Sequence, residues 1–251
     1  MAPSLSTLNS PLSTALVTGG AVRLGRALVE ALAGEGLRVI VHYHRSAAAA
    51  EEVVAGLRAR GGEAVARAAD LARLDEVERL AAEAEAVWGG VDVLVNSASV
   101  FPPQGLLETD AALWEQTLAV NLRAPVFLTR LLAPGMKRRG HGVVINLADL
   151  AGLQAWRGYA AHGIAKAGLI HFTRSAARAL APEIRVNAIA PGTVLPPDDF
   201  SAADMERLRA RIPLGRTGSP ADVVEALRYL LRAEFVTGEV LGVDGGRRLA
   251  G

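Results

Sequence analysis

Residues 18–25 of the chain read Thr-Gly-Gly-Ala-Val-Arg-Leu-Gly, and they join a short apolar run, Ala15–Val17, to the amphipathic stretch Leu24–Gly34. Glycines at a strand-to-helix turn let the backbone approach a pyrophosphate, and the amino end of the helix stabilises its negative charge. The strict G-x-G-x-x-G spacing is absent, so the turn taken alone also fits an ordinary strand–helix connection. On the nucleotide-binding interpretation, the candidate cofactor-binding residues are Gly19, Arg23, Leu24 and Gly25.

The same alternation of short β-rich runs and longer amphipathic runs continues along the chain. Most of the short runs lack the polar alternation of a half-exposed strand, which indicates strands covered on both faces. Strand–helix alternation without a compositional break predicts an α/β protein with a single Rossmann-type doubly wound parallel sheet and helices on both faces. The expected strands are Ala15–Val17, Arg38–His42, Ala64–Ala68, Val91–Asn96, Gly142–Leu147, Arg185–Ile189 and Val240–Val243; the expected helices are Leu24–Gly34, Ala47–Arg60, Leu74–Trp88, Ala111–Arg139, Tyr159–Leu180 and Pro220–Leu231.

Two segments fall outside this alternation. Residues 1–12 are rich in Ser and Pro, with neither a charged start nor an apolar stretch, and they are expected to form a flexible N-terminal tail before one domain at 13–251. Residues 193–212 contain most of a Pro-dense loop and a short helical stretch. Because long irregular segments in compact domains often cover a site, a substrate lid is expected there.

Composition excludes several classes of protein. The 27 basic and 26 acidic side chains leave a formal charge of +1, which provides no excess basic face for a nucleic acid. The chain has no cysteine, which excludes disulfides, thiolate metal sites and a cysteine nucleophile. The longest apolar runs are too short to cross a bilayer, so we expect a cytoplasmic protein with no membrane partner.

The end of the second expected strand favours one cofactor. Where an NAD-binding protein places an acid for the ribose hydroxyls, this chain has His44-Arg45-Ser46. A guanidinium and a hydroxyl suit a 2′-phosphate, which favours NADP(H) over NAD. His42 and His44 lack a third ligand nearby, so no metal site is expected.

Further motifs resemble those of the short-chain dehydrogenase/reductase family over residues 12–249. Ala69-Asp70-Leu71 matches the family's adenine-contacting turn, and the segment 94–99, Leu-Val-Asn-Ser-Ala-Ser, is similar to its Asn-Asn-Ala-Gly strand end. Asn121, Pro191-Gly192 and residues 236–246 follow at family-like spacings. The resemblance implies that Asn121 holds a water and that the cofactor also contacts Asp70, Leu71, Asn96, Ala98, Ser99, Lys166, Pro191 and Gly192.

Four local features are similar to the pteridine reductase branch of that family. Arg23 stands where most members carry Gly, and residues 42–46 match the branch's NADP signature. Ser99 and Phe101 follow the Asn-x-Ala segment, and the matching aromatic residue stacks on the pterin ring in that branch. Asp149 stands where most of the family carries its catalytic Ser. The resemblance implies a substrate site formed by Arg23, Ser99, Phe101 and Asp149.

The family's catalytic signature, Tyr-x-x-x-Lys on a helix, is matched only in part. Lys166 is in place, but the residue four positions before it is His162. Imidazole has an ordinary pKa of about 6.5 and exchanges protons near neutral pH without assistance, so an Asp149–His162 pair can supply a proton directly or through one water. Tyr159 is an alternative donor, and loss of activity is a further interpretation of the same change.

These features together predict an NADPH-dependent reductase that transfers hydride to a ring C=N bond of a pterin or dihydropterin. Its catalytic residues are expected to be Asp149, His162, Lys166 and Asn121. One alternative is a carbonyl reductase acting on a 3-oxoacyl thioester or a sugar ketone, and another is a non-catalytic NADP-binding module. The family resemblance also implies a homotetramer, with a small-residue helix face formed by Ala160, Ala161, Ala165 and Gly168 at a subunit contact.

Overall fold

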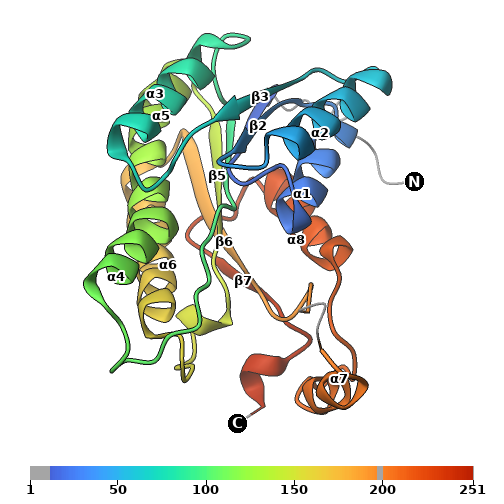
Figure 1. Ribbon diagram of the computed structural model, residues 1–251. Coiled ribbons are helices and arrows are strands. Elements are labelled where there is room, and N and C mark those ends of the chain that lie inside the picture. Colours follow the sequence, from blue (N-terminus) through green and yellow to red (C-terminus); the bar gives the residue numbers. More distant parts are fainter. Residues whose placement is uncertain (1–11, 197–199, 251) are drawn as a thin grey trace.

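A computed structural model describes residues 12–196 and 200–250 of the chain. Seven strands, all paired in parallel, form one sheet in the order β3-β2-β1-β4-β5-β6-β7 (Figure 1). The expected doubly wound α/β fold is therefore confirmed, and each expected strand is present. The strands are β1 Thr14–Val17, β2 Arg38–Tyr43, β3 Ala64–Ala68, β4 Val93–Asn96, β5 Gly142–Leu147, β6 Ile184–Pro191 and β7 Val240–Val243.

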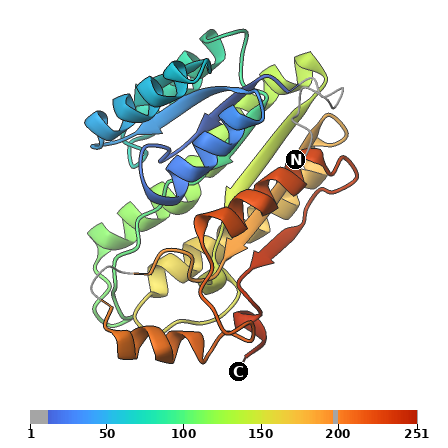
Figure 2. The same ribbon diagram turned by 90° about the vertical axis from the view of Figure 1, so that its right-hand side faces the viewer.

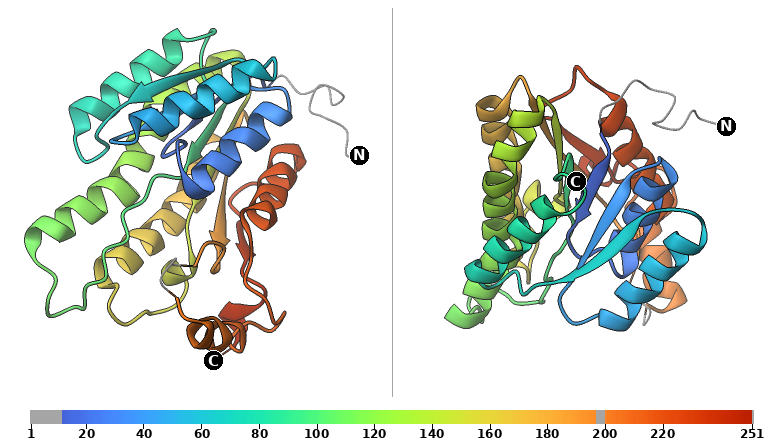
Figure 3. Two further views of the ribbon diagram at one scale, coloured as in Figure 1. Left: turned by 45° about the vertical axis from the view of Figure 1, so that its right-hand side comes forward. Right: turned by 90° about the horizontal axis from the view of Figure 1, so that it is seen from above.

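Helices cover both faces of the sheet, as Figures 1 and 3 show. One face carries α1 Arg23–Gly34, α2 Ala47–Ala59 and α8 Pro220–Arg232; the other carries α3 Leu74–Ala86, α4 Ala111–Leu118, α5 Ala124–Arg139 and α6 Ala160–Leu180. The sequence predicted one helix over 111–139, but a π-helical turn at Ala119–Arg123 separates α4 from α5. This turn contains Asn121, and π-turns inside helices are frequent at functional sites.

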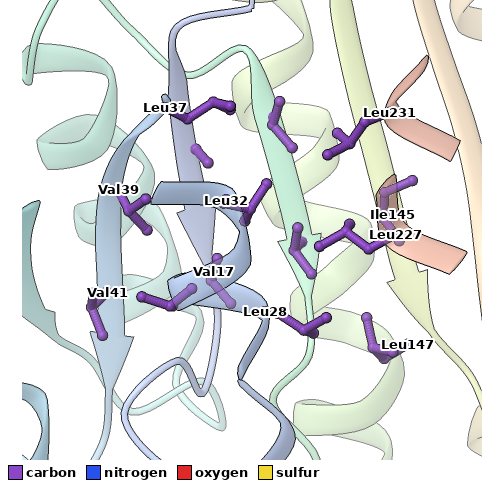
Figure 4. Close-up of a cluster of buried hydrophobic side chains, with 14 of the residues drawn as sticks. Val17, Leu28, Leu32, Leu37, Val39, Val41, Ile145, Leu147, Leu227 and Leu231 are labelled. Atoms are coloured by element: carbon purple, nitrogen blue, oxygen red, sulfur yellow. The ribbon is translucent and has the colours of Figure 1, made fainter. Parts of the chain in front are cut away.

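Two large apolar clusters and one small cluster hold the layers together. Beneath α1, α2 and α8, buried side chains such as Leu28, Leu32 and Leu227 pack on Val39 and Ile145 of the sheet (Figure 4). A second cluster lies under α3, α5 and α6 on the opposite face. Strands between two helical layers have no solvent-facing side, so their sequences are apolar without polar alternation. These uninterrupted apolar runs are the pattern from which the strands were predicted.

The strand order fixes where a ligand can enter. The chain runs outward from β1 through β2 to β3, and it then returns to β4 on the other side of β1. The helices after β1 and β4 consequently lie on opposite faces, and they leave a crevice at the carboxyl ends of these two strands. Beyond this end of the sheet lie α7, Ala202–Arg209, and the final turn Arg247–Leu249 (Figure 2).

Two details correct the sequence-based expectations. Leu12, placed in the flexible tail, packs against the cluster under α1, while residues 1–11 lie outside the described residues. Ala161 and Ala165, expected at a subunit contact, are buried within their own chain. These two residues pack inside the chain, whereas Ala160 and Gly168 are half-buried, and the homotetramer stays a prediction. No helix in the described part of the chain is long and apolar enough to cross a membrane.

Candidate active site

The glycine-rich turn after β1 is held in one conformation by close backbone packing. Gly19 has a φ of +64°, which favours glycine, and a Cβ there would lie 3.0 Å from the Cα of Ala98. A Cβ on Gly25 would lie 2.0 Å from the carbonyl oxygen of Gly19, so α1 can start at this turn only with glycine in that position. The hydroxyl of Thr18 accepts hydrogen bonds from the backbone amides of Ser97 and Ala98, which joins the turn to the end of β4.

His42 fixes the same turn from the other side. Its Nδ1 accepts a hydrogen bond of 3.0 Å from the amide of Gly19, so its Nε2 is the protonated nitrogen and donates to the carbonyl of Ala69 at 3.0 Å. Burial lowers the pKa of His42 to about 4, although the bond to Ala69 acts in the opposite direction. His42 is therefore a neutral structural residue that connects β1, β2 and the segment after β3.

A cleft of about 530 Å³ opens at the crevice predicted by the strand order. Most of the residues predicted to bind the cofactor line it, with two exceptions. Ser46 is not among the lining residues and precedes α2 as its N-terminal flanking residue. Asn96 is buried and donates to the side chain of Asn146 at 2.8 Å. The predicted residues that line the cleft are Gly19, Arg23, Leu24, Gly25, His44, Arg45, Asp70, Leu71, Ala98, Ser99, Lys166, Pro191 and Gly192.

The chemistry of this cleft fits a nucleotide with an extra phosphate. A pyrophosphate can approach the Gly19–Gly25 turn closely, because side chains are excluded there by the backbone contacts described above. His44 and Arg45 are exposed at the carboxyl end of β2. Among the described residues, Asp70 is the only one whose carboxylate lies within ion-pair distance of either side chain, 3.9 Å from Nε2 of His44. The side chain of Asp70 also accepts from the amide of Ala72, which fixes the turn predicted to contact adenine.

The structure brings Asp149 and His162 into direct contact. Nε2 of His162 lies 2.5 Å from Oδ2 of Asp149, and Oδ1 of Asp149 accepts from the amide of Ala151. The Asp149 side chain is 21% exposed, whereas that of His162 is 2% exposed. Burial raises the pKa of Asp149, but the hydrogen bond from His162 and the charge of Lys166 together lower it by more. The pKa of Asp149 therefore lies below its ordinary value. Asp149 is thus the more accessible member of the pair.

The π-turn positions Asn121 on the far side of the imidazole. Its Oδ1 accepts from the amide of Val100, and its Nδ2 donates to the carbonyl of Val100, both at 2.8 Å. Nδ2 also lies 3.1 Å from Nδ1 of His162, which in turn lies 3.2 Å from the Val100 carbonyl. The water expected at Asn121 stays a prediction, and in the structure its amide contacts Nδ1 of His162. Nδ1 can accept from Asn121 when the ring is neutral and donate to Val100 when it is charged.

Lys166 lies one helical turn after His162 on the same face of α6. It is buried, and its ammonium donates to the carbonyl of Leu147 at 2.6 Å. Burial lowers the pKa of Lys166, while the charge of Asp149 acts in the opposite direction. Lys166 lines the cofactor cleft but not the adjoining pocket, so its place in the structure is consistent with the predicted contact to the cofactor.

A second pocket of about 760 Å³ adjoins the cleft. Asp149, Ser99 and Arg23 line both cavities, whereas Phe101 and His162 line only the second. The guanidinium of Arg23 donates to the carbonyl of Leu195 in the segment predicted to be a lid. The pocket is therefore bounded by the four predicted substrate residues and by the lid segment, of which residues 197–199 lie outside the described residues.

Sequence reasoning missed much of this second pocket. The ring of Tyr159 stacks on Phe101 with centroids 4.3 Å apart, and Trp156 meets Phe101 edge-on at 6.4 Å. The three Trp residues are scattered along the sequence, but the spacing of Trp156 and Tyr159 just before α6 was a usable signal. Arg211 and Arg247, also missed, come from beyond α7 and from the final turn.

Comparisons with known proteins show that the chain is similar to reductases in both sequence and fold. Residues 20–248 match the family described as enoyl-(acyl carrier protein) reductase. The chain is 38% identical over 242 residues to a 3-oxoacyl-[acyl-carrier-protein] reductase of Synechocystis, with 92% of this chain and 95% of that protein covered. Its fold matches FolM alternative dihydrofolate reductase 1 from Brucella canis, solved with NADP, with a TM-score of 0.89, 35% identity and 95% of each chain covered. The Brucella suis protein, also solved with NADP, matches with the same TM-score and identity.

Proposed function

Since the chain belongs to the short-chain dehydrogenase/reductase family, we propose that it is an NADPH-dependent reductase of a pterin or dihydropterin. The observation that carries the proposal is the Asp149–His162 pair, which lies beside the ring of Phe101 where the two cavities meet. A flat heterocycle held against Phe101 has a ring nitrogen that needs a proton, and the pair is a proton source within the same pocket. The neighbouring Brucella structures are alternative dihydrofolate reductases, which supports a pterin-like substrate.

The cleft residues are assigned to NADP(H), which supplies the hydride when bound. The glycine turn would receive the pyrophosphate, and His44 and Arg45 would receive the 2′-phosphate. Lys166 would bind the nicotinamide ribose through its ammonium. These assignments agree with the NADP found in the two Brucella structures.

Asp149 and His162 would work as one proton-donating unit. With Asp149 ionised, the proton between Oδ2 and Nε2 belongs to the imidazole, and when Nδ1 also carries a proton it donates a hydrogen bond to the carbonyl of Val100. Because Asp149 is the exposed member, we assign it the contact with the substrate nitrogen. The proton would pass from Nε2 of His162 through Oδ2 of Asp149 to that nitrogen, which leaves Asp149 ionised and the imidazole with its single proton on Nδ1. The low pKa of Asp149 argues that it cannot hold this proton alone at neutral pH. The amide of Asn121 and the carbonyl of Val100 hold the Nδ1 side of the ring in place.

The comparisons also favour a second candidate, a 3-oxoacyl thioester reductase, because that is the name of the Synechocystis relative. Reduction of a ketone needs a donor that stabilises the developing alkoxide. The hydroxyl donors Ser and Tyr that the family uses for this purpose are replaced here by Asp149 and His162, and the hydroxyl of Tyr159 belongs to a ring that stacks on Phe101. We therefore rank the pterin ahead of the thioester.

The test is NADPH oxidation by the purified protein with three substrates, 7,8-dihydrobiopterin, dihydromonapterin and acetoacetyl-coenzyme A, over a range of pH. We expect turnover of a pterin and a loss of about 10²-fold or more in kcat for His162→Ala, the scale of general acid catalysis. Tyr159→Phe is the matched control, because it removes only a hydroxyl and keeps the stacked ring.

Each outcome assigns a role. Pterin turnover that survives His162→Ala contradicts the proton-donating pair, and turnover lost in Tyr159→Phe transfers the role to Tyr159. Reduction of acetoacetyl-coenzyme A without any pterin turnover replaces the proposed substrate. NADPH binding with no oxidation in any of the three assays indicates a non-catalytic NADP-binding protein.

A further inference from the structure

The second pocket carries an excess of positive charge that the proton-donating pair does not use. Four arginines line it, Arg23, Arg157, Arg211 and Arg247, and among its described lining residues Asp149 is the only acid. That acid is already bonded to His162. The pocket therefore presents several guanidinium groups to whatever enters it.

About half of the arginines elsewhere in the chain, 11 of 21, lie within ion-pair distance of a carboxylate. Arg79 binds Glu76 and Glu83, and Arg139 binds Glu85 and Asp92. In contrast, within the described residues none of the four pocket arginines lies within ion-pair distance of a carboxylate. Unpaired cations gathered around one concave pocket favour an anion as the bound group.

Arg247 is the most strongly positioned of the four. Its Nη1 donates to the hydroxyl of Thr193 at 2.7 Å, and its guanidinium carbon lies 5.4 Å from the ring centroid of Trp156. Burial and the nearby charge of Arg211 lower the pKa of Arg247, although Asp244 acts in the opposite direction. Both guanidinium groups line the same pocket, and an anion bound between them would offset the repulsion of their charges.

The aromatic residues connect this arginine pair to the proton-donating pair. The rings of His162 and Phe101 are 4.6 Å apart, those of Phe101 and Trp156 are 6.4 Å apart, and Arg247 lies over Trp156. A planar head group beside Phe101 can thus extend a substituent along Trp156 toward Arg247. Arg211 reaches the same pocket from just beyond α7, at the end of the lid segment.

We propose that Arg211 and Arg247 form an anion subsite, and that the substrate is a pterin whose side chain ends in a carboxylate or a phosphate. The nature of the head group rests on the proposed function, whereas the subsite rests on the arginines themselves. A bound anion would also bridge two parts of the chain, because Arg211 follows α7 and Arg247 belongs to the final turn.

The test compares KM for three dihydropterins: 7,8-dihydrofolate, which ends in carboxylates, 7,8-dihydroneopterin monophosphate, and uncharged 7,8-dihydroneopterin. In the double variant Arg211→Gln/Arg247→Gln we expect KM for the anionic substrate to rise about tenfold or more, as expected for losing charge-assisted hydrogen bonds, with kcat and the KM of the uncharged substrate unchanged. Arg247→Lys keeps the charge but loses the planar stack on Trp156, so it should have an intermediate KM. The substrate with the larger change in KM identifies carboxylate or phosphate as the anion.

Arg209→Gln is the control for net charge, because Arg209 lies on α7 and does not line the pocket. Calorimetric titration of the NADP-loaded protein with p-aminobenzoylglutamate and with phenyl phosphate measures anion binding without a pterin. Anion binding that is lost in the double variant but kept in Arg209→Gln supports the subsite even if no pterin is reduced. A failure of the subsite can therefore be distinguished from a failure of the proposed function. Unchanged KM values for both anionic substrates, or anion binding that survives the double variant, would overturn the inference.

Discussion

The cofactor cleft and the substrate pocket adjoin each other, but they are built from different parts of the chain. The cleft is built around the glycine-rich turn at the carboxyl end of β1, which is held by buried contacts such as His42 to Gly19. The pocket consists largely of side chains from segments distant in sequence, including Phe101, Trp156 and Arg247. Changes in the cleft should therefore disturb folding and cofactor binding together, whereas changes in the pocket should alter substrate use alone.

The largest effect is expected at Gly25. In Gly25→Ala the new Cβ would lie 2.0 Å from the carbonyl oxygen of Gly19, a contact with rigid backbone that only a shift of the turn can relieve. We expect loss of measurable NADPH binding and a decrease in unfolding free energy of about 3 kcal/mol, at the upper end of overpacking costs. Fluorescence titration with NADPH and urea denaturation measure the two effects.

Gly34→Ala in the same helix is the matched control for this change. A Cβ on Gly34 meets nothing within 4 Å, so alanine there should stabilise α1 by a few tenths to about 1 kcal/mol and leave NADPH binding unchanged. Similar results for the two variants would contradict the claim that backbone packing fixes the cleft.

The next effect concerns the pH dependence of stability through His42. Its pKa is about 4 in the folded chain against about 6.5 when unfolded, so between these values the unfolded chain binds a proton that the folded chain excludes. Stability should therefore be complete above pH 6.5 and fall as the pH drops toward 4, by about 3 kcal/mol in total. Urea denaturation across this range measures the slope.

His42→Asn should flatten that slope, because the buried titrating group is removed. His171→Asn is the control, since His171 is an exposed residue of α6 and its loss should leave the slope as it is. A slope that persists in His42→Asn would mean that other groups produce it.

The same difference between the two regions explains what the sequence could predict. Glycines, strand ends and the His44-Arg45 pair are local signals, and the parallel sheet brings strand ends together whatever the rest of the chain does. The pocket depends on how loops fold back across the sheet, which no local pattern encodes. Trp156 and Arg247 are far apart in sequence and meet only in the folded chain, and the role of Asn121 required the π-turn.

Phe101→Ala tests the pocket without touching the cleft. The ring contacts Tyr159, His162 and Trp156, and its loss removes the surface against which a flat substrate would stack. We expect KM for the pterin to rise about tenfold, the size of one lost aromatic contact, while the Kd for NADPH stays unchanged. Phe101→Tyr keeps the stack and should keep KM. A large change in the Kd for NADPH would mean that the two regions are not independent.

The smallest effect lies at Arg23, which belongs to both regions. Its φ of +51° costs a non-glycine residue about 1 kcal/mol, while its guanidinium donates to Leu195 in the lid segment. Arg23→Gly and Arg23→Ala both remove the bond to the lid, but only the glycine relieves the backbone. The glycine variant should therefore be more stable than the alanine variant by about 1 kcal/mol in urea denaturation. Both variants should raise KM for the pterin by the same small factor, because that part of the effect comes from the lost contact with the lid. Equal stabilities of the glycine and alanine variants would show that the turn imposes no strain on Arg23. A KM that differs between these two variants would show that the conformation of the turn affects substrate binding.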